Sequence, residues 1–401
     1  MGSILDRLAA AVGYERRDMA GTMGLPFGGG WPGVAGLSSA GYAITPIAAE
    51  NLSTTTACVN AIASALASLP AYVYRLADGG RMEEPGHPVS ALIREPNAWQ
   101  TWPDWVEMTM GQALLQGNAL SIIETDANGK PTALVPVPWQ NVSMQLAPSG
   151  RVIYDIVAFQ SPFGGTGVPR RLLQDQVFHL KDRGDNHYLG RSRISRAPEV
   201  LGNAIALQEF SGAQWRNGVT PSGAIQMDAS LTPEQFSRLR NQFDQNFAGA
   251  HNARKVLVLD NSAKWQPLSV SPEDAEVLAS RRFSVEEICR LFGVPGPIAG
   301  DLSHGTFTNS ETAGRWFAMF TLAPWCRKLE AEFQRSVFTN ANRHLEIDLS
   351  GLMRGSYAER WQANVAAVQA GILTADEVRE AEGYNPLQRP EAPGTGDDAL
   401  G

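Results

Sequence analysis

The feature that most constrains this chain is a series of helix starts separated by prolines and glycines between residues 271 and 338. Three segments place a hydroxyl and a carboxylate three residues apart: Ser271–Asp274, Ser284–Glu287 and Thr308–Glu311. In this spacing each side chain accepts a hydrogen bond from a free amide at the start of a helix. The pattern therefore predicts helices at 272–282 and 285–292 and a long helix that opens at Thr308.

Prolines divide this helical region. The stretch VPGPIAGD at residues 294–301 specifies turns and predicts a loop. Pro324 lies inside the long helix, where its ring clashes with the carbonyl of Phe320 and its missing N–H removes one bond. We predict a kink there. It would let Trp316, Phe317 and Phe320 face one neighbour, while Leu329, Phe333 and Val337 face another. The alternative is a helix that ends at Ala323.

Composition indicates a folded chain of several domains. Its 401 residues are 43% hydrophobic and 18% charged, which is typical of globular proteins. The net charge of −8 argues against tight binding of a polyanion, although it permits contact. No apolar run approaches the roughly 18 residues that a membrane span needs, so we expect no membrane association.

The three cysteines are distant from one another, and each lies among apolar residues: Cys58, Cys289 and Cys326. We expect buried, reduced thiols and a reducing cytoplasm. Residues 1–50 are expected to form a flexible N-terminal arm, because the glycine-rich part needs a partner to hold one conformation. Order is expected near Asn51.

Residues 51–195 predict an α+β domain. Helices are expected at 53–69, 87–94 and 101–117, with strands at 72–76, 121–124, 132–137, 142–146 and 151–159. Asn128-Gly129 between two of these strands is a strong hairpin signal.

A helix at 197–218 then leads to a small insert with a strand at 223–227, a helix at 233–248 and a strand at 255–259. After the long helix we expect a strand at 344–349, helices at 356–370 and 375–382, and a disordered tail from residue 387.

We find no catalytic motif in a sequence context that would support it. Gly28, Gly30 and Gly33 match a dinucleotide fingerprint only as a string, without the strand and helix that give it meaning. Asp182, Asp185 and His187 form the best polar cluster, but a solvated turn explains it better than a cation site. Basic residues outnumber acidic ones in 170–196, an excess that could face phosphates or a neighbouring subunit. We expect no enzyme, no cofactor and no metal.

The order of the parts resembles portal proteins of long-tailed double-stranded DNA phages, a family also found in gene transfer agents. The similar stretches are Leu52–Tyr74, His87–Asn97, Gly117–Ala119, Gly190–Ser192, Asn217–Gly218, Pro221–Gly223, Lys255–Leu259, Ser271–Asp274, Phe292–Pro295 and Leu322–Trp325. Each is a turn or cap on its own, and their collinear order carries the resemblance.

The resemblance implies a subunit with an α/β wing, a helical stem, a small α/β clip, a long kinked helix and a short helical crown. By position, the wing would be 51–195 and 309–350, the stem 196–219 and 269–293, the clip 220–268, the tunnel loop 294–308, the crown 351–385 and the tail 386–401. About twelve copies would form a ring at one capsid vertex in the virion, assembled in the host cytoplasm. Partners would be double-stranded DNA, the large terminase, the head–tail adaptor and the major capsid protein.

The polar residues of the tunnel loop would line the channel: Asp301, Ser303, His304, Thr306 and Thr308. The alternative is a connector under the wing that buries Ile298 and Leu302. We expect the interfaces between subunits to use helix 53–69 and the stem helices. Small residues of helix 53–69 would let a neighbouring backbone approach closely: Ala57, Ala61, Ala65 and Ala67. Two other readings of the whole chain stay open, a ring-forming scaffold or adaptor that conducts no DNA and a hydrolase with an unrecognised site.

Overall fold

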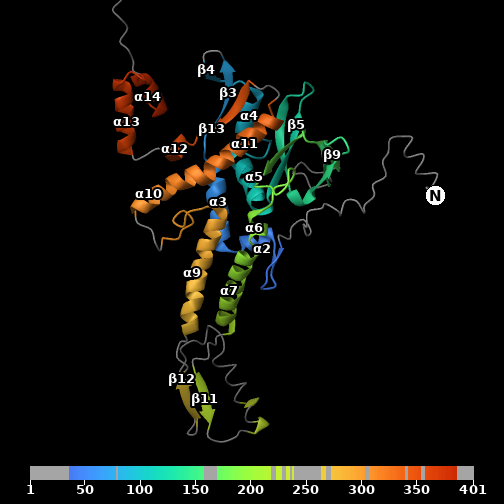
Figure 1. Ribbon diagram of the computed structural model, residues 1–401, viewed down its shortest axis with the longest axis vertical. Coiled ribbons are helices and arrows are strands. Elements are labelled where there is room, and N and C mark those ends of the chain that lie inside the picture. The colour runs from blue at the N-terminus through green and yellow to red at the C-terminus, as the bar shows by residue number, and fades with distance from the viewer. Residues whose placement is uncertain are drawn as a thin grey trace, which may run out of the picture. The chain divides into compact units, whose positions relative to one another are not determined.

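The computed structural model describes residues 36–77, 80–157, 169–217, 223–227, 232–234, 237–238, 263–267, 272–302, 307–338, 342–353 and 357–385. The chain divides into two compact units, Met1–Leu349 and Ser350–Gly401. Helices and strands both build the first unit (Figure 1), so the predicted α+β class is confirmed.

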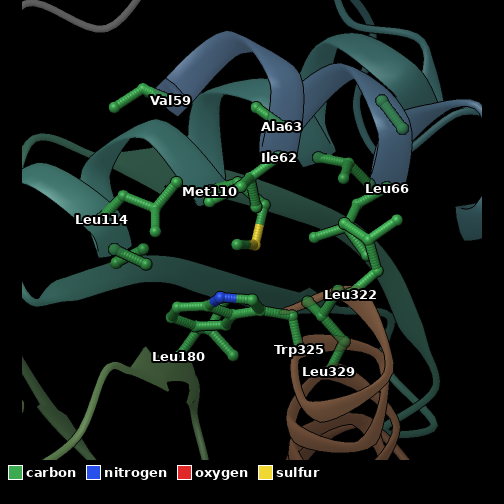
Figure 2. Packing of buried hydrophobic residues seen from close by; sticks show 14 of the residues in the cluster. Val59, Ile62, Ala63, Leu66, Met110, Leu114, Leu180, Leu322, Trp325 and Leu329 are labelled. Carbon is green, nitrogen blue, oxygen red and sulfur yellow. The ribbon is translucent and has the colours of Figure 1, made fainter. Parts of the chain in front are cut away.

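The core of the first unit forms around helix α3 (Ser53–Ala67), which packs against α5 (Trp102–Gln116). Apolar side chains on α3 recur at helical spacing, so one face of the helix is buried. Figure 2 shows that face meeting α5 on one side and α11 (Ala323–Ser336) on the other. The side chains that meet there include Ile62, Leu66, Met110, Leu114, Trp325 and Leu329.

The ends of α5 follow from its sequence. Thr101 and Asp104 form the capping box that opens the helix. Gly117 closes it with φ +80°, and a Cβ at this position would lie 2.5 Å from the backbone nitrogen of Ser192. Only glycine fits a left-handed position with so close a backbone.

Three antiparallel sheets of three strands surround these helices. The first joins β10 (Val177–Lys181), β5 (Asn118–Thr125) and β6 (Pro131–Val137). The second joins β7 (Val142–Leu146), β8 (Val152–Ile156) and β9 (Arg170–Leu173). The third joins β13 (Arg343–Ile347), β3 (Ala71–Ala77) and β4 (Gly80–Glu83). The predicted 128–129 hairpin is confirmed, whereas the prediction missed β4, β9 and β10.

Two long antiparallel helices, α7 (Pro198–Asn217) and α9 (Pro272–Phe292), extend side by side from the body (Figure 1). We call this pair the stem. Between them in the chain, β11 (Gly223–Met227) pairs with β12 (Ala263–Pro267). Strand 223–227 is confirmed and β12 was not predicted. The predicted strand 255–259 and most of helix 233–248 lie outside the described residues.

The expectation of two helices at 272–282 and 285–292 is wrong, because α9 is continuous. Ser284 does not cap a second helix. Its buried side chain donates a hydrogen bond of 3.0 Å to the carbonyl oxygen of Ser280, one turn earlier. A serine in mid-helix commonly satisfies its hydroxyl in this way.

The described residues begin at Gly36, so the chain already has defined structure before Asn51. Strands β1 (Gly36–Leu37) and β2 (Ala43–Ile44) form a hairpin, followed by α2 (Pro46–Glu50). We call residues 36–50 the N-terminal strap. Thr45 caps α2 by accepting a bond of 3.0 Å from the amide of Ala48.

The described part of the first unit also contains the short helices α4 (Pro88–Arg94), η1 (a 3₁₀ turn, Trp139–Asn141) and α6 (Arg193–Arg196).

The second unit contains α12 (Ser350–Met353), α13 (Tyr357–Gln369) and α14 (Ala375–Ala381). The predicted helices 356–370 and 375–382 are confirmed. Thr374 and Glu377 form a capping box at the start of α14.

Candidate functional site: the loop after the stem and its supports

The loop after α9 starts with a defined stop. Gly293 has φ +68°, and the amide of Val294 donates to the carbonyl oxygen of Cys289 at 2.9 Å. This bond across five residues is the usual way to close a helix with a left-handed glycine.

The loop then folds into local turns. The amide of Ile298 bonds to Pro295, and the amide of Asp301 bonds to Gly296 at 2.8 Å. Ile298 is half-buried against the main core, while Leu302 is exposed. The alternative with both side chains buried is therefore wrong for Leu302.

The structure describes only some of the residues that were predicted to line the channel. Asp301 is half-buried at the end of the described loop, and Ser303, His304 and Thr306 lie outside the described residues. Helix α10 (Phe307–Trp316) already includes Thr308, so Thr308 belongs to the helix and does not open it. The channel-lining role of all five residues stays a prediction.

A π-helical segment, η3 (Phe317–Leu322), connects α10 to α11. The amide of Ala323 bonds to the carbonyl of Ala318, five residues back. Pro324 follows at the second position of α11 and does not end the helix, so the alternative stop at Ala323 is wrong. The chain absorbs the proline by a change of helical register. The predicted kink itself stays a prediction.

The register change decides which side chains face out. Trp316 is 61% exposed and Phe320 is 72% exposed, whereas Phe317 is buried. The expected grouping of these three aromatic residues is therefore wrong for Phe317. The other three residues do share one side, as expected, and that side faces the core of their own chain. Leu329, Phe333 and Val337 are all buried.

A hydroxyl group of η3 binds the start of the loop. Thr321 Oγ1 donates a hydrogen bond to the carbonyl oxygen of Gly293. Thr321 lies in η3, and the far end of the loop continues through α10 into the same segment. The start of the loop is thus held to η3, and α10 lies between the far end of the loop and η3.

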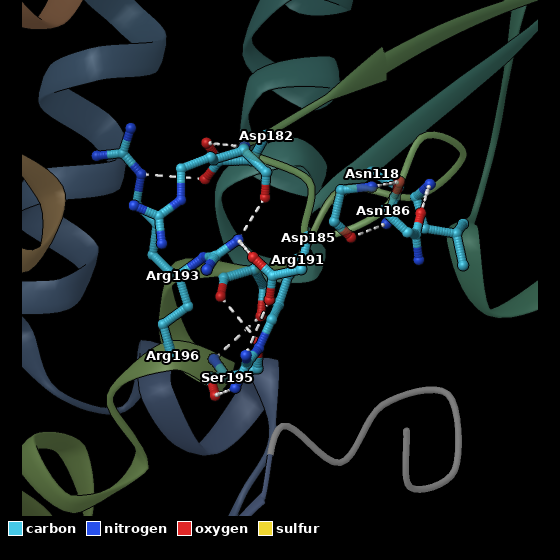
Figure 3. Close-up of polar contacts among 12 residues, drawn as sticks. Asn118, Asp182, Asp185, Asn186, Arg191, Arg193, Ser195 and Arg196 are labelled. Atoms are coloured by element: carbon cyan, nitrogen blue, oxygen red, sulfur yellow. Dashed lines mark hydrogen bonds and ion pairs between the residues drawn. The ribbon is translucent and has the colours of Figure 1, made fainter. Parts of the chain in front are cut away.

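Arg193 holds the end of α9 to the body (Figure 3). Its Nε bonds to Asp182 Oδ2 at 3.1 Å, and its Nη1 donates to the carbonyl oxygen of Phe292, the last residue of α9. Its guanidinium lies 5.8 Å from the ring centre of Trp325. The Arg193–Asp182 ion pair is mostly buried, so removing either partner would leave the other charge buried and unpaired.

The acidic side chains of the candidate cation cluster, Asp182 and Asp185, are paired with arginines. Asp185 pairs with Arg191 at 2.9 Å and with Arg196 at 2.7 Å, and these two hydrogen bonds hold the pKa of its carboxyl below the usual value. Asp182 pairs with Arg193. Among the described residues, no group of three histidine, cysteine or acidic side chains is placed to hold a metal.

The basic excess in 170–196 is largely neutralised within the chain. Besides the pairs just described, Arg170 bonds to Glu124 at 2.7 Å and Arg171 to Asp155 at 2.8 Å. These partners come from other elements of the fold, which the local charge count does not reveal. The excess therefore gives no phosphate-binding patch from these residues.

A buried histidine links two of the sheets. His179 Nδ1 lies 3.0 Å from the Tyr154 hydroxyl, and Nε2 lies 3.1 Å from Asn118 Oδ1. Because that amide oxygen can only accept, we assign the proton to Nε2 and have Nδ1 accept from Tyr154. Burial lowers the pKa of His179 to about 3, so the ring is neutral.

The three cysteines are buried free thiols, as expected. Within the described residues, no helix combines the length and apolar character needed to cross a bilayer. Ala67, which was predicted at a subunit contact, is buried in its own core, while Ala61 and Ala65 are partly buried there.

Comparison with known proteins agrees with the order of elements. The probable portal protein of Streptomyces phage phiC31 is 30% identical over 372 residues, which is 88% of this chain and 78% of that protein. The portal protein of Enterobacteria phage HK97 is 28% identical over 347 residues, covering 84% and 79% of the two chains.

A solved chain has a similar fold. It comes from the neck of a native gene transfer agent particle, computed with C12 symmetry, and aligns with TM-score 0.60 and 25% identity over 85% of this chain and 92% of that one. The family model described as phage portal protein matches residues 53–383. The chain therefore belongs to the phage portal protein family.

Proposed function

We propose that about twelve copies of this structural protein form a ring at one capsid vertex of the virion, and that double-stranded DNA passes through it during packaging and ejection. Family membership supports the portal role, and the C12 symmetry of the similar neck structure supports a ring.

The main support for a DNA-conducting channel is the way in which the loop after α9 is held in place. Its start is fixed by Thr321 to η3, and its end enters the same segment through α10. From Gly293 to Thr308 the sequence contains no Lys or Arg, and it carries Asp301. A surface without cations can touch a duplex without binding its phosphates, so DNA can slide past.

The remaining assignments follow the resemblance. The clip at 220–268 would dock the large terminase during packaging and the head–tail adaptor afterwards. The wing would contact the major capsid protein, and residues 351–385 would form the crown. The protein would assemble in the host cytoplasm and catalyse no reaction.

Deletion of Ser303–Thr306 tests the conduit. We expect rings of normal mass that yield particles with less DNA, because the shortened loop no longer reaches the channel. A matched control removes Asp397–Leu400 from the predicted disordered tail and should leave packaging unchanged.

The possible outcomes separate the hypotheses. Intact rings whose particles fill and retain DNA normally would contradict the loop assignment and favour a scaffold. A wild-type protein that stays monomeric or dimeric at all salt and protein concentrations would contradict the ring itself.

A further inference from the structure

The N-terminal strap lies along the stem of its own chain. The amide of Ser39 bonds to both oxygens of Glu199, at 2.9 and 3.1 Å, and the Tyr42 hydroxyl donates to Glu209 at 2.7 Å. Between these contacts, Ser38 packs directly on Gly202, where a Cβ would come within 2.3 Å of it. The strap therefore packs closely against α7, and contacts with α7 fix its position.

The strap precedes the part of the chain that the family model matches, which starts at residue 53. It buries Ile44 completely, yet it exposes two large apolar side chains, Leu37 at 72% and Ile47 at 75%. Exposed apolar side chains on a segment that is otherwise closely packed indicate a surface that another protein covers.

A second apolar side chain is exposed on the other stem helix. Phe283 of α9 is 52% exposed, with the guanidinium of Arg290 at 5.3 Å from its ring centre. Arg281 and Arg282 next to it are exposed as well. An aromatic ring bordered by arginines is typical of the residues that dominate protein interfaces.

The strap and α9 lie on opposite sides of α7. In Figure 1, α9 is on one side of α7 and the hairpin of the strap is on the other. A cyclic ring uses two different faces of each subunit, so one face of a subunit meets the opposite face of the next.

The surfaces also lie at the same level of the stem. Phe292 of α9 accepts a hydrogen bond from Arg193, the first residue of α6, which is the short helix before α7. Phe283 is nine residues before Phe292, or about 13 Å along the antiparallel helix, which falls within the stretch between Glu199 and Glu209 that holds the strap. Rotation about a ring axis parallel to the stem keeps this level, so the two surfaces can meet.

Their charges are complementary. The strap and residues 198–213 of α7 contain three carboxylates, Glu50, Glu199 and Glu209, and no Lys or Arg. Residues 281–290 around Phe283 carry three arginines and two glutamates, Glu286 and Glu287, which gives this segment a net charge of +1, and Glu286 is paired with Arg290. Opposite charges around two apolar centres favour one pairing and its orientation.

We propose that the strap of one subunit docks onto α9 of the next subunit in the ring, with Leu37 and Ile47 packing around Phe283. The occupant of the strap surface is thus a second copy of this chain. The proposal rests on the proposed ring, and it assigns the strap as an added clasp between neighbouring stems.

Disulfide trapping tests the contact. Full-length protein carrying Leu37→Cys and Phe283→Cys is oxidised with copper(II) phenanthroline. When two thiols join, two copper(II) ions accept the two electrons and the buffer takes the two protons. We expect a ladder of covalent multimers up to the complete ring. The control pair is Leu146→Cys with Phe283→Cys, because Leu146 is a similarly exposed leucine on β7; it should give no ladder.

Light scattering of the same samples separates the two proposals. Rings without a 37–283 ladder overturn the strap contact and leave the proposed function standing, whereas protein that forms no ring overturns the proposed function. In a second measurement, Leu37→Ser with Ile47→Ser should raise the protein concentration at which rings dissociate about tenfold. Unchanged dissociation would also overturn the contact, and Leu146→Ser is the matched control.

Discussion

Thr321 donates its hydroxyl hydrogen bond to the carbonyl oxygen of Gly293, the residue at which the stem ends and the loop begins. The two residues are 28 positions apart in the chain. This bond joins a π-helical segment to the left-handed glycine that stops α9. The position of the loop is therefore set by η3 as well as by the stem.

Thr321→Val removes this donor without a large change in volume. We expect a loss of about 1–2 kcal/mol in the free energy of unfolding, because the Gly293 carbonyl loses its partner in a partly buried place. Amides of residues 294–301 should exchange hydrogen faster. Thr321→Ser, which keeps the hydroxyl, should restore most of the protection, and equal exchange in both variants would contradict the role of the bond.

Pro324→Ala should fold and should assemble poorly. Alanine supplies the missing N–H and removes the ring clash, so the chain can return from π to regular α geometry. A shift of one residue turns the preceding helix by about 100°, which redirects Trp316 and Phe320. Sedimentation should show monomers with normal circular dichroism. Pro272→Ala, at the first position of α9 where no amide is needed, is the control and should form rings.

The stability of the first unit should fall as the pH drops below about 6.5. Burial lowers the pKa of His179 to about 3 in the folded state. Between pH 3 and the pKa of the unfolded chain, about 6.5, the unfolded chain therefore binds one more proton than the folded chain. The folded state then loses up to about 1.4 kcal/mol per pH unit from this group. Denaturant unfolding of wild type and His179→Gln should show a shallower pH dependence in the variant. Parallel curves would show that His179 does not make this contribution.

Gly202→Ala should release the strap from α7. The new Cβ would lie 2.3 Å from Ser38, which forces the hairpin away, while the helix itself gains from alanine. Limited proteolysis should cut within residues 36–44 faster than in wild type. Gly212→Ala is a matched control on the same helix, since nothing lies within 4 Å of its added Cβ. Similar cleavage of both variants would mean that Gly202 does not hold the strap.

The sequence alone determined the elements whose signals are local. Helix α5 has its capping box and closing glycine within its own residues, and the 128–129 turn sets the β5–β6 hairpin. The collinear turns and caps also sufficed to recognise the family. Such signals depend on neighbours a few residues away, so they can be read without the fold.

Tertiary structure decided the rest. Ser284 has the sequence of a cap but is buried inside one continuous helix, and the strap is held by Glu199, Gly202 and Glu209 of a distant helix. Arg170 and Arg171 belong to a local excess of basic residues, and the fold brings Glu124 and Asp155 from other strands to pair with them. These outcomes depend on contacts between residues far apart in the chain, whose burial and pairing energies exceed local preference and cannot be counted from a linear pattern.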